Sequence, residues 1–450
     1  MRGKHTFSLI KFFSVAVVVA GFFLTEFNVR QTLKKSTQVN DSITVASSSN
    51  SVDKIHLRRP DYNITRRPNS TSLDVDEQMN DIERISRAFP LWIKDRLTID
   101  SNSRAYDWCV PNDLISENTN SPKGIFFIKS PKSGSSTGAA VTGRIRDELS
   151  RRLTNNNATS PSNCFTHYVH ATAGELKLQN RDPMRSFLWS IVREPAQRTL
   201  SYFFYRLVSQ ANVTATEDGI MAVLKKEKPY DDGRNDHNFQ SQYLDLPHQT
   251  ELQDKNSSIT TSAVDRIING YDFLAVNERM DESLVVLAML AQIPLADVVV
   301  FSSKVSGGYA THGKEFKGYI GCMKVTKKWT TPKIDEYIAG DYRIANKDDY
   351  LLYNAAQRSL DKTIDALGRQ RVKENVKLLK SLQQQNEEQC ASKVTIRCPE
   401  PEDPEMKRKH KRLAEESCFY NDVGCGHACT DEVLSDYAER EWARILTSGP

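Results

Sequence analysis

The chain has 450 residues, 39% of them hydrophobic, with 61 basic and 57 acidic side chains. A formal net charge of +4 gives no indication of nucleic-acid binding, and we expect no nucleic-acid partner. The sequence contains no internal repeat, and the part after residue 85 is long enough for one large core or for a core with an appendage.

The N-terminal segment predicts a membrane anchor. Residues 7–24 are apolar apart from serines and Lys11, and basic residues precede them. Such a run is near the lower length limit for a spanning helix, and the preceding positive charge places the N-terminus in the cytosol. We therefore predict a cytosolic tip and a signal-anchor transmembrane helix over residues 1–27. A cleaved signal peptide with its site near Ala20 is the alternative.

Residues 28–85 have the composition of a flexible, glycosylated stem. They are rich in Ser, Thr and Asn and contain few aromatic residues, a composition that cannot bury a core. N-glycosylation sequons fit surface loops of a luminal protein. They occur at Asn40, Asn63, Asn69, Asn157, Asn212 and Asn256.

The segment 125–137 predicts a loop that binds phosphate. Four apolar residues lead into a serine-rich loop with two lysines, and an apolar stripe over residues 138–153 then indicates a helix. Backbone N–H groups at the start of such a helix favour an anion. A Walker A loop would place its lysine after the last glycine, but Lys132 precedes Gly134. In the simpler interpretation the serines only cap the helix.

A second motif begins where another apolar strand, residues 187–192, ends at Arg193. Pro195 suits the first turn of a helix, and that helix would carry Ser201 two turns further on. The planar donors of an arginine can hold a phosphate bidentately. Alternatively, Arg193 forms only an ion pair at the strand end, and Arg198 is a solvated helix charge.

Together these motifs resemble those of sulfotransferases that use 3′-phosphoadenosine-5′-phosphosulfate (PAPS). In that family a Pro-Lys-Thr-Gly-Thr-Thr-like loop follows the first strand, and residues 131–136 match it with serine in place of threonine. An Arg-x-Pro strand end and a later serine hold the 3′-phosphate. The resemblance implies that Lys132 is catalytic, as the cation at the leaving bridging oxygen, and that no metal takes part. The implied PAPS-binding residues are Ser130, Lys132, Ser133, Gly134, Ser135, Ser136, Thr137, Arg193 and Ser201.

The resemblance is closest to the Golgi galactose 3-O- and uronyl 2-O-sulfotransferases. Residues 271–287, with a strand, a turn and a leucine-rich helix, and residues 348–356 are similar to segments of those enzymes. We expect these segments to build the core, and we also expect a strand over residues 297–301. The similarity covers residues 123–365 and implies a glycan as the acceptor.

The catalytic base is expected between the two cofactor motifs. The resembling enzymes carry a histidine pair in this region, and histidine titrates near neutral pH. His170 is our candidate and His167 the alternative, because a strand would send the two side chains to opposite faces. Glu175 and His237 are further candidates.

Two other groups of residues could meet the acceptor. The segment around Asn238, Gln240 and Tyr243 resembles an acceptor-side element of some Golgi sulfotransferases. Basic residues of the helix after the loop could bind an acidic polysaccharide, although such charges are usually only solvated. They are Arg144, Arg146, Arg151 and Arg152.

Residues 366–450 differ in character and predict a charged helix followed by a disulfide-tied appendage. All eight cysteines lie beyond the anchor, and an even number in an oxidising lumen favours disulfides, although the pairing does not follow from the sequence. A zinc site formed by the cluster over residues 418–429 is the alternative. The cysteines are Cys109, Cys164, Cys322, Cys390, Cys398, Cys418, Cys425 and Cys429.

Strands alternate with helical segments, which predicts an α/β fold with a mostly parallel sheet covered by helices. The resemblance implies a P-loop-like sulfotransferase fold over residues 86–365. We therefore expect a single-pass type II Golgi membrane protein that transfers sulfonate from PAPS to a glycan hydroxyl. An inactive glycan-binding luminal protein on the same fold and a P-loop kinase or NTPase are the alternatives. The oligomeric state does not follow from the sequence.

Overall fold

The structure, a computed structural model, describes ten segments of the chain. The expected anchor, the stem and most of the sequons and cysteines lie outside these segments. The described residues are 124–155, 166–167, 170–183, 186–227, 237–246, 262–301, 306–307, 309–316, 319–390 and 427–448.

Four parallel strands form the central sheet, in the spatial order β2-β1-β3-β4. Every residue of β1, β3 and β4 is buried, which explains why these strands read as unbroken apolar runs. The expected α/β character with a parallel sheet is therefore confirmed, although the sheet is small and most described residues are helical. The strands are β1 (Gly124–Ile128), β2 (Thr166–His167), β3 (Ser186–Val192) and β4 (Phe273–Val276).

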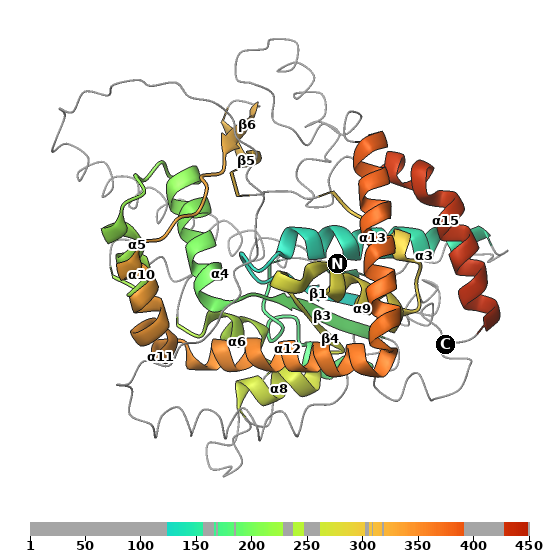
Figure 1. Cartoon of the computed structure of the whole chain (residues 1–450), viewed down its shortest axis with the longest axis horizontal. Coiled ribbons are helices and arrows are strands. Elements are labelled where there is room, and N and C mark those ends of the chain that lie inside the picture. Colours follow the sequence, from blue (N-terminus) through green and yellow to red (C-terminus); the bar gives the residue numbers. More distant parts are fainter. Residues whose placement is uncertain are drawn as a thin grey trace, which may run out of the picture. The chain divides into compact units, whose positions relative to one another are not determined.

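Helices cover the sheet and share one hydrophobic cluster with it. In Figure 1, α3 lies above the strands, and α12 with α8 lies below them. Val141, Ile145 and Leu149 are buried, so the apolar stripe expected after the loop is confirmed. The helices of this cluster are α3 (Ser135–Asn155), α6 (Phe239–Leu244), α8 (Ala263–Gly270), α9 (Met280–Ala291), α12 (Lys347–Leu367), α13 (Arg369–Cys390) and α15 (His427–Ser448).

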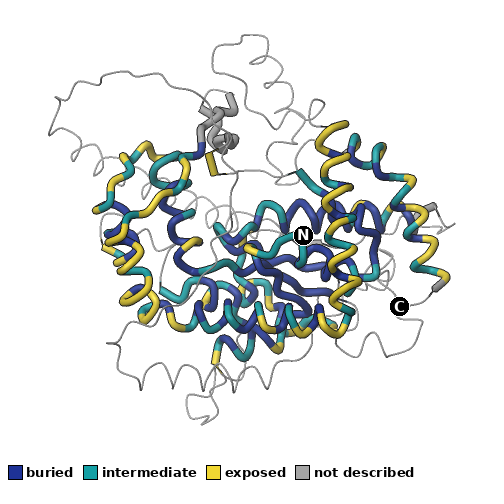
Figure 2. Tube along the Cα trace, viewed as in Figure 1, coloured by how far each residue is buried: buried dark blue, intermediate teal, exposed yellow. Residues whose placement is uncertain are grey.

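A second hydrophobic cluster lies beside the sheet and is built mainly from helices on either side of a β-hairpin in the sequence. Figure 2 shows buried residues on the inner sides of these helices and exposed residues on their outer sides. The helices that build it are α4 (Pro195–Tyr202), the π-helix η5 (Phe203–Gln210), α5 (Glu217–Leu224), α10 (Pro332–Tyr337) and η8 (Ile338–Tyr342). The antiparallel hairpin β5 (Tyr309–Phe316) and β6 (Tyr319–Lys324) precedes α10 in the sequence, and the short helix α11 (Arg343–Ala345) follows η8.

Three short 3-10 helices complete the described elements: η4 (Leu178–Asn180), η6 (Asn277–Arg279) and η7 (Leu295–Val298). The strand expected over residues 297–301 is wrong, because η7 occupies its first two positions. Asp297 is completely buried there and binds Arg152, so its carboxylate fixes a turn at the edge of the core.

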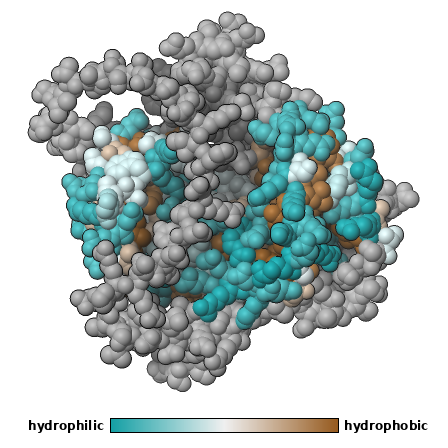
Figure 3. Space-filling view, viewed as in Figure 1, coloured by the Kyte–Doolittle hydropathy of each residue, from teal (hydrophilic) through white to brown (hydrophobic). Residues whose placement is uncertain are grey.

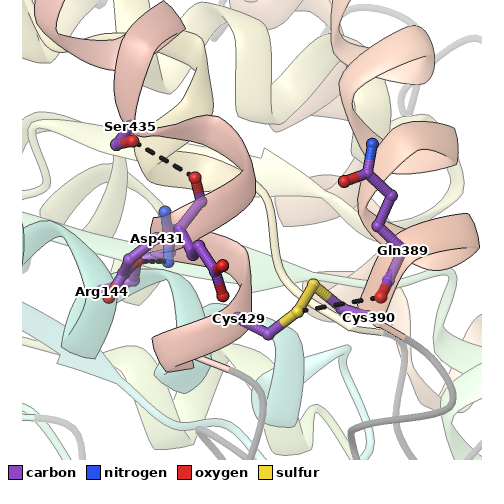
Figure 4. Close-up of a disulfide and its surroundings, with 7 residues drawn as sticks. Arg144, Gln389, Cys390, Cys429, Asp431 and Ser435 are labelled. Atoms are coloured by element: carbon purple, nitrogen blue, oxygen red, sulfur yellow. Dashed lines mark hydrogen bonds and ion pairs between the residues drawn. A yellow bond between two sulfur atoms is a disulfide. The ribbon is translucent and has the colours of Figure 1, made fainter.

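The C-terminal helices pack on the core. Leu379 in α13 and Leu434 in α15 belong to the same buried cluster as the sheet. A disulfide joins Cys390 at the end of α13 to Cys429 in α15, and beside it Arg144 of α3 binds Asp431 (Figure 4). The helices α13 and α15 are thus fastened to the core by apolar packing, α15 also by an ion pair, and the disulfide joins the two helices to each other.

On the face that Figure 3 shows, the described residues are largely hydrophilic, with patches of hydrophobic residues among them. Of the helices in the ten segments, none has both the length and the apolar composition to cross a membrane.

Candidate functional site

The site is built around the loop between β1 and α3, at the carboxyl edge of the sheet. Lys132 and Gly134 both have positive φ angles, of 66° and 87°. A side chain at Gly134 would bring its Cβ within 2.5 Å of Oδ1 of Asn277, just after β4, so only glycine fits. The left-handed conformation of Lys132 is uncommon for a residue with a side chain and indicates a site held by its surroundings.

The hydroxyl groups of the loop face two ways. Ser130 and Ser133 are buried, and their Oγ atoms lie 3.3 Å apart. Ser133 also donates to Oε1 of Gln240 at 3.1 Å. By contrast, Lys132, Ser136 and Thr137 are partly exposed. Ser130 and Ser133 therefore stabilise the loop through hydrogen bonds in the protein interior. Lys132, Ser136 and Thr137 are the residues that can reach an anion.

Two arginines from the second motif bind successive carbonyl groups of the loop. Arg193, directly after β3, donates from Nη1 to the Lys132 oxygen at 3.0 Å. Arg198 in α4 donates from Nη1 to the Pro131 oxygen at 3.4 Å. Arg198 is only 1% exposed, and its guanidinium lies 4.0 Å from the centre of the Phe239 ring. The interpretation of Arg198 as a solvated charge is therefore wrong.

Gln240 joins the two motifs from a third element, α6. Its Oε1 accepts from the Arg193 backbone N–H at 2.9 Å, and its Nε2 donates to the Arg193 oxygen at 2.8 Å. The side chain is completely buried, so the segment that resembles an acceptor-side element here supports the loop. His237, another candidate base, is within 3.2 Å of Asn346 through Nδ1.

Positive charge concentrates around Arg193. Its Nε is buried, makes no hydrogen bond within the described segments, and lies 3.8 Å from Oε1 of Glu278. Burial lowers the pKa of the Arg193 guanidinium, and the carboxylates of Glu278 and Glu194 oppose this effect. An additional anion here would gain a buried donor without having to displace a close ion pair.

Lys328 is a functional candidate that the sequence did not reveal. Its Nζ donates to Oε1 of Gln197 in α4 at 3.0 Å. Burial, with the charge of Arg193 adding to it, lowers the pKa of Lys328 to about 8. In the sequence Lys328 follows Lys327 and looks like ordinary surface charge, because only the fold brings it to α4.

Lys132 rests on an aromatic ring. Its Nζ lies 3.5 Å from the centre of the Tyr205 ring, a cation–π contact. Tyr205 belongs to the π-helix η5, and burial raises the pKa of its hydroxyl. Inserted π-turns are frequent at functional sites, where they redirect a side chain. Here the π-helix supplies the surface that supports the ammonium group.

His170 lies at the start of the loop. It is exposed, and its Nδ1 is 2.8 Å from the backbone oxygen of Lys129. A carbonyl oxygen can only accept, so Nδ1 carries the proton and the basic lone pair is on Nε2. His167 lies in β2 opposite Phe126, and its side chain is outside the described part.

Two further residues from the sequence analysis are also placed. Glu175 accepts from the N–H and the hydroxyl of Thr172 at 2.7 and 3.0 Å, and these bonds lower its pKa. A carboxylate held in this way is a weaker base than an ordinary one. Ser201 is in the last turn of α4 and is partly buried.

The arginines of α3 mainly serve the structure. Arg152 is buried and binds both carboxylate oxygens of Asp297, at 2.6 and 2.9 Å. Arg144 binds Asp431, and Arg151 binds Glu148 at 2.7 Å as well as an acidic residue of α15. The expectation that this helix face binds an acidic polysaccharide is therefore not supported, because the cations already face carboxylates.

Within the ten described segments, no group of three or more His, Cys, Asp or Glu side chains is arranged to hold a metal ion. Cys429 of the alternative zinc cluster is bonded to Cys390, and the other cysteines of that cluster lie outside the described residues.

No protein-family model matches this chain, and no curated protein matches it either.

Proposed function

We propose that this protein is a sulfotransferase that moves sulfonate from PAPS to a hydroxyl group of a glycan. The observation that carries the proposal is the bond from Arg193 Nη1 to the Lys132 oxygen at 3.0 Å, because it joins the two motifs expected to hold the donor. Both motifs follow neighbouring parallel strands, and the carboxyl edge of such a sheet is where ligands bind in open α/β folds.

The P-loop-like sulfotransferase fold is part of this proposal. A buried strand, a tight loop and a long helix with one apolar stripe follow each other over residues 124–155. The next strand of the sheet in space, β3, carries the Arg-x-Pro sequence at its end. This arrangement supports the proposed fold.

The donor would be held by its two anionic ends. The N-terminus of α3, with Ser136 and Thr137, suits the 5′-phosphosulfate, because its N–H groups and dipole favour an anion. Arg193 and Lys328 suit the 3′-phosphate, which would give the buried Nε of Arg193 a partner. Ser201 adds a hydroxyl from α4 in this proposal.

Transfer requires a base, a positive charge and alignment. His170 would take the acceptor proton on Nε2 while the hydroxyl oxygen bonds to sulfur. The bond from sulfur to the bridging phosphate oxygen breaks, and Lys132 stabilises the charge that develops there. The products are the sulfated glycan and 3′,5′-adenosine bisphosphate. The proposed reaction uses side chains and includes no metal ion.

The proposed location of the protein rests on its N-terminal sequence. An N-terminal signal anchor would make it a single-pass type II protein of the Golgi membrane, with the site in the lumen. The disulfide Cys390–Cys429 agrees with an oxidising compartment.

Calorimetry tests the donor class directly. We expect the full-length chain in detergent to bind 3′,5′-adenosine bisphosphate with micromolar affinity, and ATP much more weakly. Arg193→Ala should abolish the binding, whereas Arg146→Ala, on the exposed side of α3, should not change it.

Three outcomes would redirect the proposal. A folded protein that does not bind the bisphosphate would not be a sulfotransferase. Equal binding of ATP would favour a P-loop kinase or NTPase. Tight binding of the bisphosphate without transfer of labelled sulfonate to any glycan would favour the inactive glycan-binding protein.

A further inference from the structure

Three side chains fix the phosphate loop from beneath. Arg193 and Arg198 bind the carbonyl oxygens of Lys132 and Pro131, and Gln240 binds the hydroxyl of Ser133. Arg193 is already assigned to the donor, but Arg198 and Gln240 are buried and lie on the protein side of the loop. Neither of these two is explained by contact with a ligand.

We propose that Gln240 and Arg198 are positioning residues that hold the loop in its anion-binding shape before the anion arrives. This inference rests on the proposed function, since it assigns roles within the same site. The affinity of the loop for the donor then depends on Gln240 and Arg198, although neither side chain touches the donor.

Arg198 acts through the peptide planes. In a trans peptide the N–H and the C=O point in opposite directions. Because the Pro131 oxygen is drawn to the buried Arg198, the N–H of Lys132 in the same plane points away from the protein interior. Arg198 also places a permanent positive charge under the loop, since an arginine stays protonated even though burial lowers its pKa.

Gln240 acts as a two-sided bridge. Its amide can be oriented in only one way, because the Arg193 N–H must donate to Oε1 and the Arg193 oxygen must accept from Nε2. The second lone pair of Oε1 then accepts from the Ser133 hydroxyl at 3.1 Å. The end of β3 and the loop after β1 are therefore held at a fixed separation by one side chain.

The bridge is itself held rigidly. The backbone N–H groups of Gln240 and Ser241 donate to the two carboxylate oxygens of Asp349, at 3.0 and 2.7 Å. Asp349 is buried at the start of α12, one of the long helices that cover the sheet. The loop is thus anchored to the core through α6 and α12. Less conformational entropy is then lost when the loop binds a ligand.

The test compares Gln240→Met with Gln242→Met, two residues further along α6. Methionine has a similar volume but leaves the N–H and C=O of Arg193 without their partners. We expect Gln240→Met to bind 3′,5′-adenosine bisphosphate about 10- to 100-fold more weakly, and Gln242→Met, whose side chain is exposed, to bind as the wild type does.

Hydrogen exchange in the absence of ligand gives an independent readout. Gln240→Met should raise deuterium uptake in the peptides that cover residues 129–138 and 190–198, without a change in α13. In steady-state kinetics the KM for PAPS should rise more than kcat falls. Ser133→Ala, which removes only one of the three bonds to Gln240, should raise uptake in the first peptide alone and weaken binding about 2- to 5-fold.

The inference is overturned if Gln240→Met keeps both the affinity and the exchange pattern of the wild type, or if Ser133→Ala leaves the loop peptide unchanged. Failure of the proposed function looks different. In that case the wild type would bind no bisphosphate, while raised exchange at the loop in Gln240→Met would still support the positioning role.

Discussion

Asn238, which directly precedes α6, and Asp349, in the first turn of α12, each cap the start of the other's helix. Oδ1 of Asn238 accepts from the N–H groups of Asp348 and Asp349 at the start of α12, at 3.0 and 3.3 Å. The carboxylate of Asp349 accepts in turn from Gln240 and Ser241 at the start of α6. The first N–H groups of a helix have no partner within the helix. The two side chains therefore supply acceptors for these N–H groups at the starts of both α6 and α12. It also fixes α6, which carries the bridge to the phosphate loop.

Removing the carboxylate of Asp349 should therefore loosen α6. We expect Asp349→Ala to lower the free energy of unfolding by about 1–2 kcal/mol, the usual cost of a lost cap. Asp348→Ala is the matched control, because its side chain accepts no hydrogen bond in the described part of the chain. Urea unfolding followed by circular dichroism measures both variants. Equal stability of the two would show that the exchange of caps contributes little.

Replacing His170 tests the proposed base. His170→Asn keeps an N–H donor for the Lys129 oxygen but removes the basic nitrogen. We expect turnover to fall roughly 100- to 10,000-fold while the affinity for 3′,5′-adenosine bisphosphate stays unchanged. Sulfonate transfer from labelled PAPS and calorimetry measure the two quantities.

Two controls accompany this variant. Glu175→Gln should retain turnover, because that carboxylate is occupied by Thr172. His167→Asn tests the alternative base. A fully active His170→Asn would show that the assignment of the base is wrong even if the enzyme class is right.

The pH dependence of nucleotide binding should reveal Lys328. Its pKa of about 8 means that the ammonium group loses its proton just above neutral pH. Affinity for 3′,5′-adenosine bisphosphate should therefore fall as the pH rises from 7 to 9, as measured by calorimetry across this range. Lys328→Arg should remove this dependence, because an arginine stays charged. The same change at the exposed Lys327 should leave it in place.

The stability contributed by Lys328 should change in the opposite direction as the pH rises. The unfolded chain binds a proton at Lys328 more tightly than the folded chain does, because burial lowers the folded pKa. The free energy of unfolding contributed by this group therefore rises with pH between about 8 and the ordinary lysine value near 10.4.

The binding experiment can also contradict the assignment of Lys328. If the affinity for 3′,5′-adenosine bisphosphate rose with pH, or fell equally in Lys328→Arg, then Lys328 would not belong to the site.

Much of the sheet could be predicted from the sequence, because parallel strands buried on both faces read as apolar runs between loops. The strands around Phe127 and Trp189 follow directly from this rule, whereas the apolar stripe of α3 follows from the period of a helix. The expected strand at Asp297 failed because a buried ion pair with Arg152 fixes a turn there. Local pattern contains no information about a partner 145 positions away.

The sequence predicted the candidate site only where a local motif identifies the functional residue. Lys132, Gly134 and Arg193 stand at strand ends, so their types and positions predict an anion site. Gln240 lies in a segment that the sequence assigned to the acceptor side, and Lys328 lies in a segment without an evident pattern. The contacts that bring them to this site span 47 residues, from Gln240 to Arg193, and 131 residues, from Lys328 to Gln197. Interactions of this kind become visible only when the chain is folded.

The ion pair between Arg152 and Asp297 provides a test of whether the arginines of α3 are structural. Both side chains are buried, and burial raises the pKa of Asp297 while Arg152 opposes this. Arg152→Met would leave a buried carboxylate without its partner, and we expect the free energy of unfolding to fall by about 3–5 kcal/mol. Arg146→Met breaks an exposed pair with Asp147 and should cost under about 1 kcal/mol.

A double variant makes this test sharper. Arg152→Met combined with Asp297→Leu removes both charges, so it should be more stable than Arg152→Met alone, because no buried carboxylate remains unpaired. Chemical unfolding of the wild type, the two single variants Arg152→Met and Asp297→Leu, and the double variant gives the coupling free energy. If Arg152→Met instead keeps its stability and loses affinity for an acidic polysaccharide such as heparin, then Arg152 belongs to an acceptor-binding surface and not to the core.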